Sequence, residues 1–303
     1  MASESRRLVI LALVANAAIA VTKFIAAAIS GSSAMLAEGI HSVADTGNQL
    51  FLLRGHSASR LKPDVHHPFG SGKELYFWAF MVAVFLFVGG GALSIYEGIL
   101  KIRDPHGHGG EGLWFSLGVL AVAGVVEITV AFRPALKEFN KQRAGRSIRR
   151  TVHEAKDPSI IVVLFEDSAA VVGLLIAAAG IIISVLTKNA IWDGIASVLI
   201  GVLLTGVAWV IALEMKALLI GESASREDRS AIRAATYSVG AVHHVERILT
   251  MRLAPEQILV NMDVAFDDGL TDEELERAVV EIENTIRESV PSATRIFVEP
   301  VRS

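Results

Sequence analysis

Hydrophobic positions form six long runs in the first two thirds of the chain. Each run is long enough for a membrane-spanning helix, which needs roughly 20 apolar residues. The runs lie near residues 8–29, 34–53, 75–100, 113–135, 159–186 and 190–218. This pattern predicts an α-helical membrane domain with six transmembrane helices over residues 1–218. The first run is longer than a signal-peptide core, so we expect it to be retained as a span.

The pattern changes after the sixth run. Residues 225–237 are typical of a helix, and the stretches VERILTMRL and QILVNMDVAF alternate in part, which predicts two strands joined by a turn. The stretch TDEELERAVVEIENTIRES is amphipathic and opens on a capping box formed by Thr271 and Glu274. TRIFVEP closes the chain as a strand. We therefore expect a small α+β domain over residues 219–303, of order αββαβ and ferredoxin-like.

Composition and charge support this division. The chain has 303 residues, of which 52% are hydrophobic, and a mean hydropathy of +0.50, which is too apolar for a soluble protein of this size. Cysteine is absent, which excludes disulfides and cysteine-based metal sites. Lysine and arginine number fourteen in the loops on one side of the predicted membrane and three on the other. The positive-inside rule places both termini in the cytoplasm, and we expect a bacterial inner membrane.

Four polar residues interrupt the second hydrophobic run. Glu38, His41, Asp45 and Asn48 are spaced three or four residues apart, so they share one face of a helix. Ionisable groups within a span are costly and usually face a partner or a water-filled path. A histidine and an aspartate four residues apart can bind one metal ion, because imidazole nitrogen and carboxylate oxygen are both zinc ligands. A second helix must then supply the remaining ligands.

The fifth run carries the candidate partners, Glu166 and Asp167. Adjacent residues of a helix point about 100° apart, so the two need not face the same ion. The alternative is that such groups form buried structural pairs, and we expect that role for Lys23 in the first run and Glu127 in the fourth. Several ionisable groups on two spans, with a histidine and an aspartate four apart, favour an ion site.

Several motifs resemble those of the cation diffusion facilitator family of divalent-metal transporters. They are HSVAD in the second run, HPFGSGKE before the third, ED in the fifth, WDGIASVLIG in the sixth, LLIGES at its exit and the terminal FVEP. The resemblance covers nearly the whole chain, and its FED motif is closest in look to the organellar-type zinc transporters. It implies six spans, a cytoplasmic αββαβ domain and a homodimer.

The resemblance also implies metal ligands. Family members bind the transported ion with one pair of residues four apart in span two and another in span five. His41 and Asp45 match the first pair, and Asp167 matches the second member of the other pair. The first member of that pair falls on Val163, which cannot bind metal.

One ligand position is therefore open, and Glu166, Asn48 or a water molecule could fill it. In the C-terminal domain, Asp263 and Phe297 stand where the family often has histidines. The resemblance thus implies a domain that dimerises without metal.

These observations predict a secondary transporter that exports a divalent cation, with zinc as the expected ion, in exchange for protons. His41 is the natural proton carrier, because imidazole titrates near about pH 6.5 and a proton and a metal compete for its nitrogen. The ion is the substrate, so we expect no cofactor. We expect the lipid bilayer as a partner and no nucleic acid. Two alternatives stay open: a manganese, iron or cobalt transporter of the same fold, and a metal-responsive sensor or scaffold. A membrane metalloenzyme is disfavoured, because the chain has neither an H-E-x-x-H motif nor a cysteine.

Overall fold

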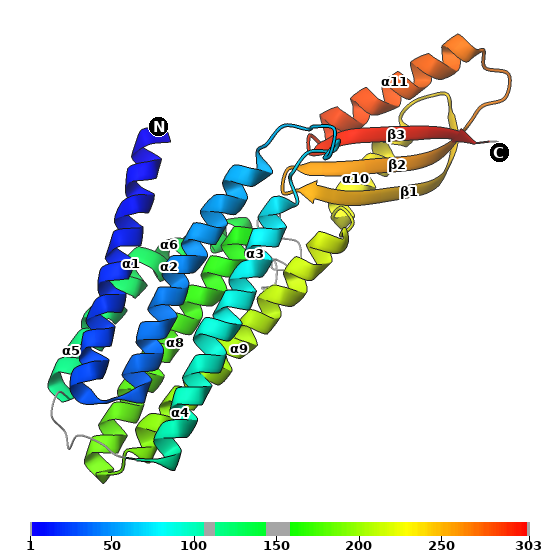
Figure 1. Ribbon diagram of the computed structural model, residues 1–303. Coiled ribbons are helices and arrows are strands. Elements are labelled where there is room, and N and C mark those ends of the chain that lie inside the picture. Colours follow the sequence, from blue (N-terminus) through cyan, green and yellow to red (C-terminus); the bar gives the residue numbers. More distant parts are fainter. Residues whose placement is uncertain (1, 106–112, 144–157, 302–303) are drawn as a thin grey trace. The chain divides into compact units, whose positions relative to one another are not determined.

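The computed structural model describes residues 2–105, 113–143 and 158–301 (Figure 1). The chain forms two compact units. The first covers Met1–His56 and Phe77–Met215, and the second covers Ser57–Tyr76 and Lys216–Ser303. The segment between the second and third hydrophobic runs therefore belongs to the same unit as the C-terminal residues.

Long helices make up the first unit. They are α1 (Ala2–Ser30), α2 (Ser33–Ser59), α3 (Glu74–Phe85), α4 (Leu93–Arg103), α5 (Leu113–Val126), α6 (Arg133–Arg143), α8 (Pro158–Thr187) and α9 (Ile191–Ile220). Two π-helices interrupt this pattern: η1 (Leu86–Ala92) joins α3 to α4, and η2 (Glu127–Phe132) joins α5 to α6. Such wider turns are rare and often occur at functional sites.

Three helical segments of the described residues are long and apolar enough to cross a membrane. They cover residues 74–103, 161–187 and 191–220. Two shorter apolar segments cover Asn16–Ser30 and Trp114–Thr129. The helix α2 has 27 residues, but its polar face lowers its hydropathy. The first unit is therefore a helical membrane domain.

The first residues of α2 are held by a carboxylate from another helix. Asp193, in the first turn of α9, accepts hydrogen bonds from the Ser33 backbone N–H at 2.6 Å and from the Ser32 hydroxyl at 2.5 Å. The first backbone N–H groups of a helix have no partner within the helix, and a carboxylate is well suited to accept from them. Asp193 is buried, so this contact fixes the start of α2 against α9.

Glycines allow α4 and α9 to approach closely. A methyl group added at Gly98 would lie 2.6 Å from the carbonyl oxygen of Gly194, and one at Gly201 would lie 2.7 Å from that of Gly91. Gly98 of α4 lies seven residues after Gly91 of η1, and Gly194 and Gly201 of α9 have the same spacing. Small residues of this kind let helices pack through backbone contacts in membranes.

We predict that Gly98→Ala destabilises the protein. The added methyl group meets backbone atoms, which cannot rotate away, so the helices must separate at a cost of about 1–3 kcal/mol. Thermal unfolding in detergent measures the change. Gly206→Ala on α9 is the matched control, because nothing lies within 4 Å of its added methyl group. Equal stability of the two variants would show that the α4–α9 contact is not tight.

The second unit contains a three-stranded sheet with two helices. Its elements are α10 (Arg226–Tyr237), β1 (Val242–Ala254), β2 (Gln257–Phe266), α11 (Asp272–Ser289) and β3 (Ala293–Val301). The strands lie in the order β1-β2-β3, with β1 antiparallel and β3 parallel to β2. This order confirms the predicted αββαβ pattern. The capping box of Thr271 and Glu274 is also confirmed, and it begins α11.

The two helices of this unit cover one face of the sheet. They contact each other, and α10 contacts β1 while α11 contacts β3. The core between them includes Ile232, Val260, Met262 and Ile282, all fully buried. Alternate residues of the strands therefore point to the opposite face, which the helices leave uncovered.

Candidate functional site

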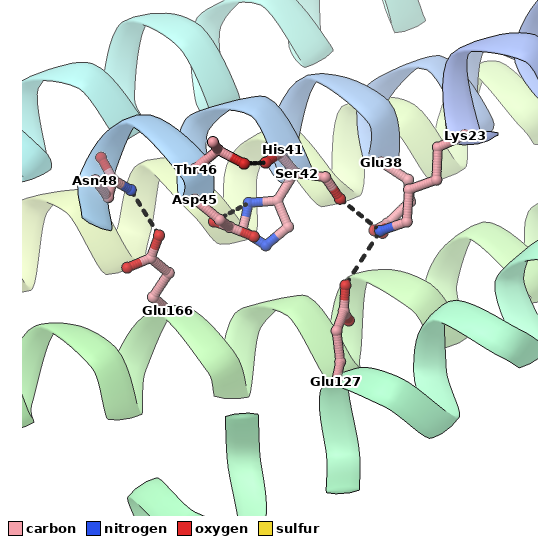
Figure 2. A network of polar contacts seen from close by, with 9 residues as sticks. All are labelled: Lys23, Glu38, His41, Ser42, Asp45, Thr46, Asn48, Glu127 and Glu166. Carbon is pink, nitrogen blue, oxygen red and sulfur yellow. Dashed lines mark hydrogen bonds and ion pairs between the residues drawn. The ribbon is translucent and has the colours of Figure 1, made fainter. Parts of the chain in front are cut away.

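The polar face of α2 points into the helical unit. The side chains of Glu38, His41 and Asn48 are fully buried, and that of Asp45 is 18% exposed. Figure 2 shows these residues in sequence along α2, with Glu38 at one end and Asn48 at the other. The single polar face predicted from the spacing is therefore present. Its members, however, have different partners.

His41 and Asp45 form the centre of this face. The His41 Nδ1 and Asp45 Oδ1 atoms lie 3.4 Å apart, one turn from each other on α2. Both ring nitrogens of His41 and the Oδ1 atom of Asp45 are buried without a hydrogen-bond partner among the described residues. Buried polar atoms normally have partners, and each one that does not needs an explanation. An imidazole and a carboxylate in this state are suited to bind a cation.

Glu166 on α8 lies next to this pair. The Asn48 amide donates a hydrogen bond of 2.6 Å to Glu166 Oε1, and the Asp45 and Glu166 carboxylates interact with each other. The side-chain oxygen of Asn48, Oδ1, has no hydrogen-bond partner within the part of the chain that the structure describes. Glu166 is therefore the fifth-run residue that reaches α2 (Figure 2).

Asp167 occupies a different position. Its side chain is partly buried, and its Oδ2 atom has no hydrogen-bond partner among the described residues. Among the described residues it forms no ion pair with His41 and no hydrogen bond with Asp45, and the buried Glu166 takes the inner position. The resemblance to the family assigned Asp167 as ligand and Glu166 as a supplementary group, whereas the contacts favour Glu166.

The candidate ligands are adjacent but do not form a closed metal cage. Across residues 2–105, 113–143 and 158–301, no three histidine or carboxylate side chains are grouped tightly enough to hold a metal ion. His41, Asp45 and Asn48 instead follow one another on α2, and Glu166 of α8 is held beside them by its hydrogen bond from Asn48.

Lys23, on α1, forms a buried ion cluster beside this site. Its Nζ atom lies 3.0 Å from Glu38 Oε2, 3.2 Å from Glu127 Oε1 and 2.8 Å from Ser42 Oγ. The buried pairing expected for Lys23 and Glu127 is confirmed by these contacts. The spacing places Glu38 on the same helix face as His41 and Asp45, but in the structure its carboxylate pairs with Lys23. Nothing in the local sequence marks Ser42 as a member.

Four other histidines, His66, His67, His243 and His244, are exposed. His67 Nδ1 is 3.3 Å from Asp64 Oδ1, and both side chains are more than half exposed. The His67 backbone N–H donates a hydrogen bond to Asp64 and is the main cause that lowers the pKa of that carboxyl below its ordinary value. His243 pairs in the same exposed manner with Asp267 at 3.5 Å. Asp64 thus acts as an acceptor for its own loop.

Comparison with known proteins gives two matches to family models and several relatives. Residues 9–220 match the cation efflux transmembrane domain, and residues 224–300 match the cytoplasmic domain of cation efflux proteins. The mitochondrial proton-coupled zinc antiporter SLC30A9 of Xenopus laevis is 31% identical over 263 residues, which are 86% of this chain and 46% of the relative. Metal tolerance protein C4 of Arabidopsis thaliana is 34% identical over 239 residues, 76% of this chain and 50% of the relative.

A bacterial relative matches over almost its whole length. The manganese efflux system protein MneP of Bacillus subtilis is 23% identical over 312 aligned residues, which cover 98% of this chain and 97% of the relative. By contrast, the chain spans about half the length of the zinc antiporter and of the plant protein.

Proposed function

Because this chain belongs to the cation diffusion facilitator family, we propose that it is a secondary transporter that exports a divalent metal ion from the cytoplasm in exchange for protons. The observation that carries the proposal is the pair of His41 and Asp45, buried between helices with unpartnered donor atoms and adjacent to Glu166 and Asn48. Relatives named as antiporters and efflux proteins support transport over catalysis.

Zinc is the proposed ion. The site offers one imidazole nitrogen together with carboxylate oxygens, and all are common zinc ligands. The relatives include a proton-coupled zinc antiporter, which supports this choice. Manganese is the second candidate. The MneP relative is named for manganese efflux, and an oxygen-rich set formed by Asp45, Asn48 and Glu166 suits manganese better than a nitrogen-rich set does.

The proposed topology has six transmembrane helices with both termini in the cytoplasm. The family match over residues 9–220 and the 29 residues of α1 support six spans, and the excess of lysine and arginine in one set of loops supports the orientation. We propose the bacterial inner membrane as the location, with the Bacillus relative as support. The C-terminal α+β domain then lies in the cytoplasm.

Exchange follows from competition at one nitrogen. A neutral imidazole binds a metal ion, and the same atom binds a proton when the metal leaves. In the proposed cycle His41 carries a proton inward after releasing zinc outward, while Asp45 and the carboxylates of α8 offset the charge of the ion. Movement of the helices alternates access to the site between the two sides of the membrane.

We also propose that the protein is a homodimer that associates through the uncovered face of the sheet. Leu249, Asn261 and Phe297 are neighbours across the three strands and share this face. Leu249 and Phe297 are each 50% exposed, and large apolar residues grouped at a surface are typical of interaction sites. The match to the cytoplasmic domain of cation efflux proteins supports dimerisation.

We predict that the dimer forms without metal and depends on Phe297. Phe297→Glu places a charge in the interface and should weaken association by about 2 kcal/mol or more, as loss of an aromatic anchor does. Sedimentation of the full-length protein in detergent with a chelator measures the effect. Val280→Glu, an equally exposed apolar position on α11, should leave the dimer intact. A wild-type protein that is monomeric until zinc is added would contradict this prediction.

Transport can be separated from sensing by one experiment. The full-length protein is reconstituted in vesicles, and zinc and manganese uptake are recorded beside zinc binding to the same preparation. A transporter takes up ions far beyond the number of binding sites. Stoichiometric binding without uptake would show a sensor or scaffold and reject the proposed function.

A further inference from the structure

The ion cluster of Lys23, Glu38 and Glu127 joins three helical elements next to the candidate metal site. Lys23 comes from α1, Glu38 from α2, and Glu127 is the first residue of the π-helix η2. The Lys23 and Glu38 side chains are fully buried, and that of Glu127 is 15% exposed. A π-turn is a costly irregularity that is often found at functional sites, and here it begins at the carboxylate.

The cluster contains more carboxylates than cations. One ammonium group faces two carboxylates, so the fully ionised cluster carries a net negative charge within the membrane domain. An uncompensated charge in this environment is costly, and binding of one proton to a carboxylate removes it. The Oε1 atom of Glu38 and the Oε2 atom of Glu127 are both buried without a hydrogen-bond partner among the described residues. Each is therefore an available position for a proton.

Glu127 is the better placed of the two carboxylates for proton exchange. Glu38 Oε1 is enclosed by α8, where a methyl group on Gly173 would lie 2.5 Å from it. Glu127 is the only member of the three whose side chain is measurably exposed in this structure. In the proposed orientation, the cluster lies on the outer side of His41, because Glu38 is nearer than His41 to the outer end of α2 (Figure 2).

The cluster also acts on the metal site through charge. Lys23 interacts electrostatically with His41 and Asp45, and Glu127 does so with Asp45 on α2 and Asp167 on α8. These interactions act at a distance, because no hydrogen bond joins Glu127 to either aspartate among the described residues. Among the residues that the structure describes, the charged groups that interact with Glu127 are Lys23, Glu38, Asp45 and Asp167. A change in the charge of Glu127 must alter how strongly the site attracts a cation.

We propose that the Lys23–Glu38–Glu127 cluster is a proton-binding site separate from the metal ligands, with Glu127 as the residue that carries the proton. The inference rests on the proposed function. A proton from the outer side binds a Glu127 carboxylate oxygen, removes one negative charge near the metal and promotes its release. Metal bound at His41 and Asp45 favours the ionised carboxylate and expels the proton. The two effects are equal in free energy, because linkage between two sites is reciprocal.

The test is the number of protons released when zinc binds. Purified full-length protein in detergent is titrated with zinc at several pH values, with a pH indicator in weakly buffered solution. Glu127→Gln cannot release a proton and keeps a carbonyl oxygen for Lys23. Compared with the wild type, we expect this variant to release fewer protons for each zinc ion bound, and its zinc affinity to rise less steeply with pH. At high pH the zinc affinity of Glu127→Gln should be roughly 5- to 150-fold lower than that of the wild type, the usual range of coupling between sites. At low pH the two proteins should bind zinc with equal affinity.

Glu97→Gln is the matched control. Glu97 is a partly buried carboxylate on α4 that lies outside the cluster, so its substitution should leave the proton count and the pH dependence unchanged. A wild-type proton count and pH dependence in Glu127→Gln would overturn the inference. A lowered count in a protein that moves no zinc across vesicles would support proton binding by the cluster and would reject only the proposed transport.

A second measurement keeps the inference testable if Glu127→Gln does not fold. Infrared difference spectra of the wild type, recorded before and after zinc addition, report protonated carboxyl groups through their C=O stretch. We expect zinc to remove such a band in the wild type. Part of the loss comes from the ligands, which also give up protons on binding metal, and Glu127→Asp should shift the remaining part of the band rather than abolish it. The absence of any lost carboxyl band in the wild type would contradict the inference.

Discussion

We expect His41→Ala and Asp45→Asn each to abolish zinc transport, lowering it by more than roughly 100-fold. Even partners of metal ligands cost about 10- to 100-fold in metal affinity when they are replaced, so loss of a ligand should cost more. The measurement is zinc uptake into vesicles that contain equal amounts of each protein. Neither nitrogen of His41 has a hydrogen-bond partner within the described residues, so its removal leaves no polar group stranded and the variant should fold.

A surface histidine is the control for this result. His66→Ala removes an imidazole from an exposed loop, and within the described ranges the hydrogen bond of that residue, to Asp64, comes from its backbone N–H rather than from its ring. It should transport zinc as the wild type does. Wild-type flux in a folded His41→Ala protein would remove His41 from the transport site, and the proposal that it exchanges protons for metal would fall with it.

We expect Glu166→Gln to lower zinc transport by roughly 10- to 100-fold, and by more than Asp167→Asn does. The order follows from the contacts, because Glu166 accepts a hydrogen bond from Asn48 on α2, whereas no hydrogen bond joins Asp167 to α2 among the described residues. An amide keeps the shape of the side chain but removes the negative charge that offsets the metal ion, and the magnitude is that found for groups around metal sites. Zinc uptake by the two variants in matched vesicles decides between them.

The opposite order would also be informative. If Asp167→Asn were the more damaging change, α8 would have to rotate about its axis when metal binds. The two side chains point about 100° apart, so one state cannot present both equally to the same ion. The structure would then represent a state in which the α8 ligand has turned away.

Patterns of local sequence were sufficient to predict most of the elements. The fifth and sixth hydrophobic runs agree with α8 and α9 to within two residues at each end, and the predicted strand at residues 257–266 agrees with β2. Membrane helices and alternating strands are set by side-chain burial, which the sequence shows directly. The end of α2 was predicted six residues too early, because hydropathy falls at the membrane boundary while helical hydrogen bonding continues to Ser59.

The partners of the polar residues could not be predicted from local patterns. Lys23 is 15 residues from Glu38 and 104 from Glu127 along the chain, so only the packing of α1, α2 and η2 brings them together. The π-helix at Glu127 has no marker in the hydropathy, because one extra residue in a single turn barely alters the periodicity. The choice between Glu166 and Asp167 likewise depends on the rotation of α8, which is set by its neighbours.

The central claim is that a proton gradient drives a divalent metal ion through the site of His41 and Asp45. Its most direct test is uphill transport. Vesicles containing the wild-type protein are prepared with equal zinc concentrations on both sides, and a pH gradient is then imposed while internal zinc and internal pH are recorded together. We predict that zinc accumulates on the acidic side as protons leave it, and that dissipating the pH gradient stops the accumulation. Zinc that merely equilibrates, with no response to the pH gradient and no proton movement, would contradict the account.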